Sequence, residues 1–467
     1  MSVYEATPEA IPYGHIGVIP ERAPAQSIPS RAAQAIANLP LVAAHNKWLR
    51  RATYSLAIGS SALALAPAVY KPAGLAESWV ASDATALIED AVGDTPTIDM
   101  RTASPKQAYD YLTSYFGMSD GLFKKGRLDF AASTWWNITA ANAMQDMSLL
   151  PGKHASEYTG SVKNLMHSLN LYWHSGQEGQ SSGYYPDVVA IHNESFGEYD
   201  DDNAWAGLAL LRQGDPASVT RSEGIFNLLM SQWDVKGGGI SWKVQLPGEV
   251  NRDRSAVSNA PAAELAFGLY FKTGKKQRLE EGNKVLDWTL MALYDPKTGL
   301  YNDHLPTPGD KDTYANHKWT YVEGTIIGAM TLANQSSSEN AKKYPLSKTL
   351  ELANRSLEYF KYCDSIGIPA FQAVYFRNLL YLVHALQKNH DPRAEQLLPK
   401  VRLAMANSIA HLPKQPTNLL DAAGGAAIKA LNEMPEGDYG RLLPSPPRQL
   451  APQNSTTKYA VAFVQHG

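Results

Sequence analysis

Apolar residues recur at every third or fourth position over most of the chain between residues 80 and 434. Ala262, Leu265, Ala266, Leu269 and Tyr270 form one such run. This spacing is typical of α-helices that bury one face, and the alternation typical of strands is scarce. The pattern predicts an all-α domain with twelve helices, at residues 105–116, 128–149, 156–173, 201–213, 220–234, 259–273, 276–294, 319–334, 345–364, 370–388, 392–411 and 418–433.

Turn residues separate these helices. Thr273-Gly274 ends one of them, and Gly367-Ile368-Pro369 lies between two others. Short connections favour antiparallel neighbours, so the helices predict six hairpins that either close into a ring or stack as an open solenoid. Periodicity does not choose between the ring and the solenoid.

The segments outside the helical region differ in composition. Residues 1–51 are rich in proline and predict a flexible arm, and residues 435–467 predict a Pro-rich, extended tail. Residues 52–70 carry no charge and are preceded by Arg50-Arg51, which predicts a signal anchor or signal peptide; an amphipathic helix covering the domain is the alternative. A signal would place the protein in the secretory pathway, secreted or anchored in a membrane. Glycosylation triplets begin at Asn137, Asn193, Asn334, Asn354 and Asn454.

The composition narrows the range of partners. The chain has 467 residues, a net charge of −3 and no basic stripe, which argues against nucleic acid as a partner. The single cysteine, Cys363, excludes an intrachain disulfide and is expected to be a structural thiol. No histidine pair has the spacing of a metal site, so we expect neither a metal nor a cofactor, and we expect a monomer.

A run of three carboxylates, Asp200-Asp201-Asp202, opens the predicted helix at 201–213. Carboxyl groups of adjacent residues at a helix start can lie about 5–6 Å apart. Retaining glycosidases separate their two acids by about 5–5.5 Å. Tyr199 and Trp205 could supply an apolar wall that binds a sugar and raises one carboxyl pKa. The alternative is a cluster that caps the helix, followed by a buried tryptophan.

Other candidate binding residues lie near predicted helix starts and in longer loops. Trp242 follows a run of three glycines and is either a sugar platform or the hydrophobic anchor of a flexible loop. Asn259 either caps a helix or contacts sugar hydroxyls. Tyr321 and Glu323 open another helix and either reach the same cleft or pack in the core.

Together, these landmarks resemble glycoside hydrolase family 76, the α-1,6-mannanases, over residues 100 to 433. The resemblance rests on Trp135-Trp136 with Asn142, residues 201–205, 237–242, 258–261, 298–301, 320–325 and 371–377. It implies an (α/α)6 toroid and cleavage of α-1,6-linked mannan or manno-oligosaccharides with retention. It assigns Asp201 as nucleophile and Asp202 as acid/base, and it adds Trp136 and Asn142 to the substrate-binding residues. Val322 and Glu323 stand where the family pattern has Asn-Gln, which leaves an additional acid near the expected cleft.

Three alternatives to a retaining endo-α-1,6-mannanase remain at this point. A mannan transglycosidase of the same family would use the same two aspartates and pass the glycosyl group to another sugar. A glycan-binding protein without catalysis would keep the aromatic residues and tolerate loss of the acids. A helical scaffold for protein partners would present an open apolar groove and would not require the acid pair.

Overall fold

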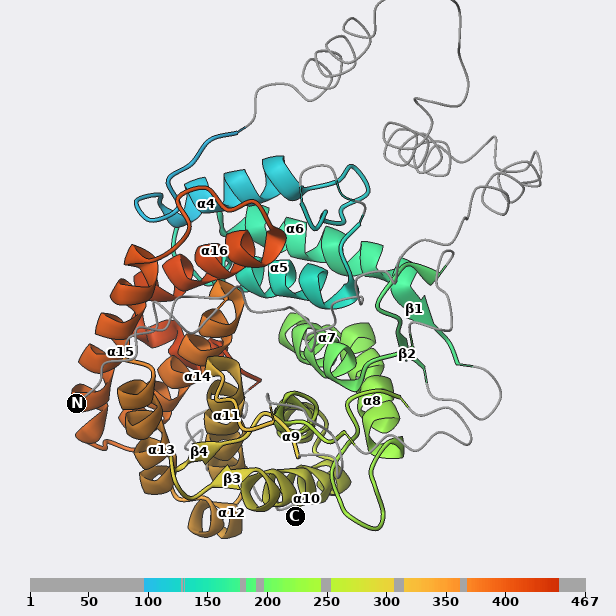
Figure 1. Cartoon of the computed structure of the whole chain (residues 1–467), viewed down its shortest axis with the longest axis vertical. Coiled ribbons are helices and arrows are strands. Elements are labelled where there is room, and N and C mark those ends of the chain that lie inside the picture. The colour runs from blue at the N-terminus through green and yellow to red at the C-terminus, as the bar shows by residue number, and fades with distance from the viewer. Residues whose placement is uncertain are drawn as a thin grey trace, which may run out of the picture.

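The computed structural model describes residues 96–444 except 127–128, 130, 177–181, 190–196, 245–252, 306–314 and 362–367. Within the described residues, six helices contact one another in a closed inner ring. Figure 1 shows how the helices are arranged. Each inner helix contacts the next along the chain, and the last contacts the first. The contacts therefore close a ring and exclude an open solenoid. The inner helices are α5 (Thr134–Met147), α7 (Asp200–Gln213), α9 (Ala256–Thr273), α11 (Thr320–Ser336), α14 (Pro369–Lys388) and α16 (Leu419–Glu433).

Six outer helices cover this ring. They are α4 (Pro105–Tyr111), α6 (Ala155–Ser168), α8 (Pro216–Ser231), α10 (Lys276–Ala292), α13 (Leu346–Tyr359) and α15 (Arg393–Ala410). Most residues of α14 and α16 are buried, whereas α6 and α13 bury only a stripe facing the ring. This difference in burial is what two concentric layers of helices require. The predicted all-α toroid is confirmed.

The pairing of inner and outer helices contains one non-local step. Five outer helices follow the inner helix that they cover: α6 packs on α5, α8 on α7, α10 on α9, α13 on α11 and α15 on α14. The sixth pair joins the two ends of the described chain, because α4 packs on α16. The simple succession of hairpins expected from the sequence therefore holds for five pairs only.

Several predicted helix boundaries were wrong by a few residues. The helix expected at 128–149 begins at Thr134, because the preceding segment is extended and bridges Lys124 to Ala131. The helix expected at 156–173 ends at Ser168 and is followed by a 3-10 turn, η3 (Leu169–Tyr172). The region after α11 contains an additional short helix, α12 (Ser338–Lys343), whose N-terminus Ser337 caps.

The remaining elements are short. A π-helical turn, η2 (Leu112–Phe116), continues α4. Strand β1 (Trp173–His174) pairs antiparallel with β2 (Gly183–Tyr184), and β3 (Tyr294–Asp295) pairs antiparallel with β4 (Leu300–Tyr301). These ribbons lie in connections between helices.

The first part of the expected C-terminal tail belongs to the domain. Residues 436–441 form a 3-10 turn, η6 (Glu436–Arg441), which contacts α14. Tyr439 and Leu442 are fully buried, and the Tyr439 hydroxyl is hydrogen-bonded to Arg402. Burial of these apolar side chains explains why the domain reaches Pro444 instead of ending near residue 434.

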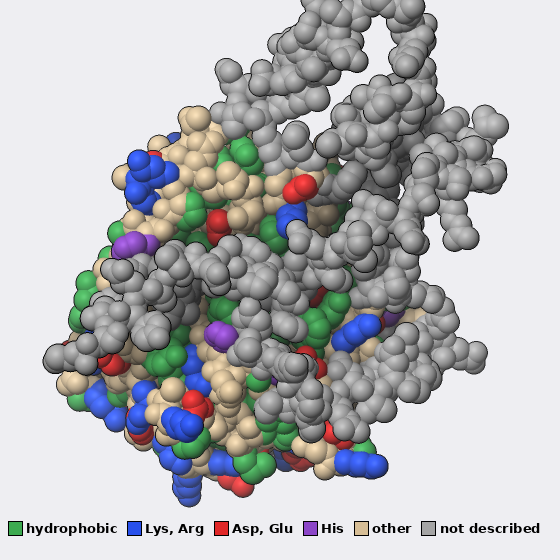
Figure 2. Space-filling model, in the orientation of Figure 1, with side chains coloured by type: hydrophobic (Ala, Val, Ile, Leu, Met, Phe, Trp, Pro, Cys, Tyr) green, Lys and Arg blue, Asp and Glu red, His purple; other side chains and the backbone are tan. Residues whose placement is uncertain are grey.

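The other predictions for the chain ends, and two for internal segments, fall on residues that the structure does not describe. These are the N-terminal arm, the segment 52–70, the tail after Pro444, Cys363 and the triplets at Asn193 and Asn454. Within the described part of the chain, no helix is both long and apolar enough to cross a membrane. Among the described side chains that Figure 2 leaves visible, acidic and basic groups are interspersed.

Candidate active site

All six inner helices contribute side chains to one cleft. The cleft combines the two candidate catalytic aspartates with aromatic and small apolar residues. Its lining consists of Trp135, Ile138, Thr139 and Asn142 from α5, Asp201, Asp202 and Trp205 from α7, Val257 from α9, Tyr321 from α11, Ala370, Phe371, Ala373, Val374 and Arg377 from α14, and Ala423, Gly424 and Ala427 from α16.

The small residues on α16 allow close approach of its neighbour. A Cβ atom on Gly424 would lie 2.1 Å from the backbone nitrogen of Ala370 on α14. Contacts that short do not occur between real side chains and backbone, so only glycine fits here. The close packing of α14 against α16 at the cleft wall therefore requires glycine at position 424.

The acidic triplet forms the first turn of α7, as the sequence predicts, but it is buried and does not act as an exposed cap. Asp200, Asp201 and Asp202 are 0%, 6% and 3% exposed. Tyr199 is extended and bridges Lys243 on an adjacent segment, and the Asp200 N–H donates to the Trp242 carbonyl at 2.9 Å. Contacts of the backbone with this segment therefore hold the acid-bearing turn in place.

Burial raises the pKa of both cleft aspartates. Burial raises the pKa of Asp201 to about 7, and nearby Asp253 adds to the rise. The Trp242 indole N–H and the backbone N–H groups of Asp202 and Asp201 lower the Asp201 pKa and so oppose this rise. The Trp242 N–H faces the Asp201 carboxyl but does not meet the geometric criteria of a hydrogen bond. Burial, followed by the charges of Asp201 and Asp187, raises the pKa of Asp202 well above its ordinary range. Two buried carboxyls on adjacent residues do not ionise together readily, so the pair keeps one proton after it has lost the first.

The third carboxyl, Asp200, lies behind the cleft. One of its oxygens accepts a hydrogen bond from the Ser241 hydroxyl at 3.2 Å, and the other has no partner. Burial and the neighbouring Glu198 raise the pKa of Asp200 well above its ordinary range. Asp200 links the start of α7 to the segment that carries Trp242.

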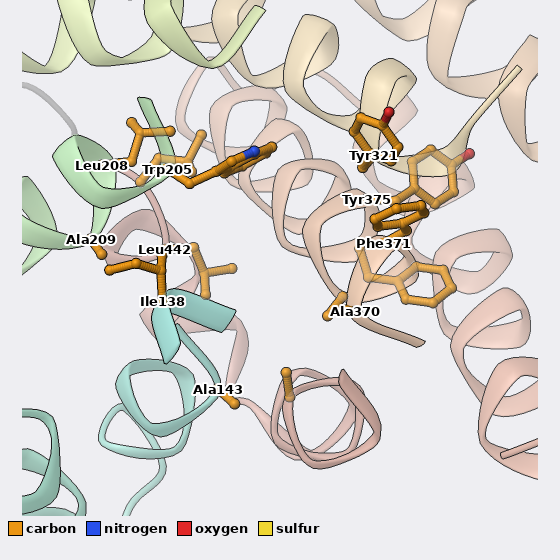
Figure 3. Close-up of a cluster of buried hydrophobic side chains, with 14 of the residues drawn as sticks. Ile138, Ala143, Trp205, Leu208, Ala209, Tyr321, Ala370, Phe371, Tyr375 and Leu442 are labelled. Atoms are coloured by element: carbon orange, nitrogen blue, oxygen red, sulfur yellow. The ribbon is translucent and has the colours of Figure 1, made fainter. Parts of the chain in front are cut away.

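Tyr321 lies on the opposite side of the cleft from α7 (Figure 3). Its hydroxyl donates to Asp303 Oδ1 at 3.1 Å, and His304 Nδ1 lies 2.9 Å from the other oxygen of Asp303. Its ring contacts Phe371, with a centroid separation of 4.3 Å. These contacts fix the orientation of the Tyr321 ring that the cleft exposes.

A buried ionic network supports the floor of the cleft. Arg377 places Nε and Nη2 against the carboxylate of Asp146, with a shortest distance of 2.5 Å. Arg212 binds the same carboxylate at 2.6 Å and donates to Asn142 Oδ1 at 3.0 Å. Asn142 therefore presents its amide nitrogen as the group still available to a ligand.

Asparagine side chains connect three inner helices to the loops around the cleft. The fourth residue of α5, α7 and α9 is Asn137, Asn203 and Asn259 respectively. Each side-chain oxygen accepts a loop N–H, at 2.9, 2.8 and 2.8 Å, and each amide nitrogen donates to backbone carbonyls. The equivalent residue of α11 is Glu323, whose Oε1 accepts the Tyr301 N–H at 2.8 Å.

Three predicted substrate-binding residues do not line the cleft. Both amide atoms of Asn259 are bonded to backbone groups of Ile240 and Ser255. The N-cap of α9 is Ser255, so Asn259 does not cap the helix as the alternative expected. Glu323 is fully buried against the Tyr301 N–H. Trp136 is buried beneath Lys125, whose Nζ lies 5.1 Å from the centre of its ring.

The other predicted residues lie at the cleft or beside it. Asp201, Asp202, Trp205, Asn142 and Tyr321 line it. Tyr199 and Trp242 are half-buried and pack against each other, with ring centroids 4.9 Å apart, next to the acid-bearing turn.

The sequence prediction did not select two aromatic residues that line the cleft, Trp135 and Phe371. Trp135 lies seven residues before Asn142, and residues with that spacing share one face of a helix. If Asn142 faces the cleft, the helical spacing therefore predicts that Trp135 faces it too, and Trp136 does not.

The described residues include no group of three or more histidine, cysteine, aspartate or glutamate side chains arranged to hold a metal ion. The expectation of a site without a metal or cofactor stays a prediction.

Comparison with known proteins agrees with this architecture. The sequence pattern of glycosyl hydrolase family 76 matches residues 99–370. Mannan endo-1,6-alpha-mannosidase DFG5 of Saccharomyces cerevisiae is 22% identical over 282 residues, which are 51% of this chain and 59% of that protein. The chain thus spans less than two thirds of the length of this relative.

Two solved structures share the fold. An inactive variant of the alpha-1,6-mannanase GH76A of Salegentibacter sp. HEL1_6, in complex with alpha-1,6-mannotriose, has a TM-score of 0.54 and 19% identity, and covers 70% of this chain and 98% of its own. Dfg5 from Chaetomium thermophilum, in complex with glucosamine, has a TM-score of 0.54 and 13% identity, and covers 71% of this chain and 89% of its own. At these identities the likeness establishes the common helical toroid.

Proposed function

Because the chain belongs to glycosyl hydrolase family 76, we propose that it is a retaining endo-α-1,6-mannanase, with Asp201 as nucleophile and Asp202 as acid/base. The observation that carries this proposal is the placement of two adjacent, buried carboxyls in one cleft, each with a raised pKa. A retaining glycosidase needs one ionised and one protonated acid at close range. The assignment of the two roles follows the family resemblance, and the exchanged assignment would use the same two residues.

In the first step, the ionised carboxylate of Asp201 attacks the anomeric carbon of a mannosyl unit. The bond from that carbon to the leaving oxygen breaks, and Asp202 gives its proton to this oxygen. In the second step, Asp202 takes a proton from water, the water oxygen bonds to the anomeric carbon, and the bond to Asp201 breaks. Two inversions at the same carbon give net retention.

The test is incubation of linear α-1,6-mannan with the wild-type protein and with Asp201→Asn and Asp202→Asn. Each variant should lower turnover at least about a thousandfold, because each removes a group that acts directly in bond breaking. Asp110→Asn, which changes an exposed carboxyl on α4, is the matched control and should retain full activity.

Three results would contradict the proposal. Full activity in both cleft variants would exclude the two aspartates from catalysis. Proton NMR of the first products would exclude retention if the opposite anomer forms initially. A wild-type protein that binds mannan without cleaving it would favour the glycan-binding alternative.

Transglycosylation is the second candidate. The relative from Chaetomium thermophilum was solved with glucosamine, an amino sugar, which supports a search for sugar acceptors here. The cleft also carries Trp135 and Phe371, apolar surfaces on which an acceptor sugar could pack in place of water. Labelled manno-oligosaccharides incubated with excess unlabelled acceptor distinguish the reactions, since transfer gives labelled products longer than the donor. A secretory location, where either reaction would meet cell-wall mannan, stays a prediction.

A further inference from the structure

A buried N–H group in the cleft lacks a partner among the residues that the structure describes. Trp205 is only 6% exposed, and its Nε1 makes no hydrogen bond to any of these residues. Leaving a buried donor unpaired is unfavourable, and most buried donors in folded proteins are paired with protein or water. An unpaired donor that lines a ligand cleft is therefore a candidate contact for the ligand.

Other indole groups in the described chain show the contrast. The Trp288 Nε1, in the outer layer, donates to the Gly237 carbonyl at 3.0 Å. The buried indole nitrogens without a full hydrogen bond are those of Trp205 and Trp242, among the residues that the structure describes. Trp242 faces Asp201, so its N–H already has a favourable neighbour. Trp205 is the one that requires a different explanation.

The position of Trp205 on α7 relates it to both acids. Trp205 follows Asp202 by three residues and Asp201 by four, so all three side chains lie toward one side of the helix within about one turn. Figure 3 shows the Trp205 ring extending from α7 across the cleft toward Tyr321 and Phe371. A sugar ring with its anomeric carbon at Asp201 would thus lie beside the indole.

We propose that the Trp205 indole N–H donates a hydrogen bond to a hydroxyl group of the glycosyl unit that is transferred to Asp201. This assignment rests on the proposed function and deepens it, because it identifies a determinant of which sugar is accepted. The partner is a hydroxyl and not a cation, since an indole N–H only donates. A sugar that lacks this hydroxyl would leave the donor buried and unpaired, and the cleft would discriminate against it.

The kinetic test compares wild type with Trp205→Phe, which keeps an aromatic ring and removes the N–H. The substrates are α-1,6-mannotetraose and analogues that lack the 2-, 3- or 4-hydroxyl on the cleaved unit. We expect Trp205→Phe to lower kcat/KM for the intact substrate about 10-fold to 100-fold, as expected for a lost hydrogen bond in a buried site. One deoxy analogue should be penalised strongly in wild type and much less in the variant.

The matched control is Trp173→Phe, because Trp173 on β1 packs under Arg221 and does not line the cleft. It should retain wild-type discrimination among the deoxy analogues. Equal penalties in wild type and Trp205→Phe for all three analogues would overturn the assignment.

A spectroscopic test separates this assignment from catalysis and from poor folding of a variant. In ¹⁵N-labelled Asp202→Asn protein, the Trp205 indole signal is identified by its absence after the additional change Trp205→Phe. Adding α-1,6-mannotriose should shift this signal and slow its exchange with water. Saturation that shifts other indole signals but leaves this one unchanged would overturn the assignment while the proposed function stands. Absence of any binding would overturn both.

Discussion

Glu323 is the fourth residue of α11, a position that carries asparagine in three other inner helices. The change Glu323→Gln tests how much stability the protein loses by having a carboxyl group there instead of an amide. Its Oε1 accepts the Tyr301 N–H, whereas Oε2 has no hydrogen-bond partner. Burial raises the pKa of Glu323 to about 8, against the opposing effects of the Tyr301 N–H and the charge of Lys318. Below pH 8 the folded protein therefore keeps Glu323 as a neutral acid, which resembles the amide of its counterparts.

The difference between the folded and unfolded pKa values of Glu323 determines how its contribution to the free energy of unfolding changes with pH. An unfolded glutamate titrates near pH 4.3, so between about pH 4.3 and 8 the folded state holds a proton that the unfolded state has released. The free energy of unfolding should fall by about 1.4 kcal/mol per pH unit over this range from Glu323 alone. The contribution is complete below about pH 4, and about 3–5 kcal/mol of it is lost once the pH exceeds 8. The Glu323→Gln variant would carry no such dependence, because an amide does not titrate in this range.

Urea denaturation at several pH values between 4 and 8.5 measures this contribution. Glu323→Gln should approach wild type in its free energy of unfolding at acidic pH and exceed it by several kcal/mol at pH 8. The reciprocal variant Asn259→Asp should acquire the same loss of stability with rising pH, because its second oxygen would face the carbonyls that the Asn259 amide now contacts. Parallel pH curves for wild type and Glu323→Gln would refute the reasoning.

Three further predictions concern the cleft and its support. The kcat/KM should rise as the pH passes about 7, because Asp201, as the proposed nucleophile, attacks only after it has lost its proton. A pH–rate profile that is flat below 7 would contradict this proposed role. Arg377→Met leaves the buried carboxylate of Asp146 with one arginine, Arg212, instead of two. The variant should lower the free energy of unfolding in urea by about 3–5 kcal/mol. A loss below about 1 kcal/mol would show that Arg212 alone is enough. Gly424→Ala should lower the free energy of unfolding by more than about 2 kcal/mol, because the added methyl group would clash with α14. The control Gly160→Ala, where a methyl group would meet no other atom, should be neutral or slightly stabilising. Equal effects of the two changes would disprove the close packing at Gly424.

The helices and the acid pair could be predicted because their signals are local. Apolar spacing at three and four residues locates the inner helices, since their buried faces are wide and continuous. The position of Asp201 and Asp202 in the first turn of α7 follows from the same spacing. Helix phase would also have identified Trp135, had it been applied from Asn142.

The roles of Asn259 and Glu323 could not be predicted in the same way. Each side chain binds the backbone of a connecting segment about 20 residues earlier, at Ile240 and at Tyr301 of β4 respectively. Neither segment has a periodic pattern that places it beside the helix start. The extended segment before α5 was missed for a similar reason, because its bridge between Lys124 and Ala131 depends on pairing and not on side-chain pattern.

The pairing of α4 with α16 has a consequence for how the protein is made. During synthesis, five helix pairs can assemble as they emerge, but the cavity wall contributed by Ala423, Gly424 and Ala427 is added only when the last inner helix leaves the ribosome. Until then the cleft lacks the wall that α16 contributes. Truncation before residue 419 should therefore abolish the cleft while most of the helices remain in the chain.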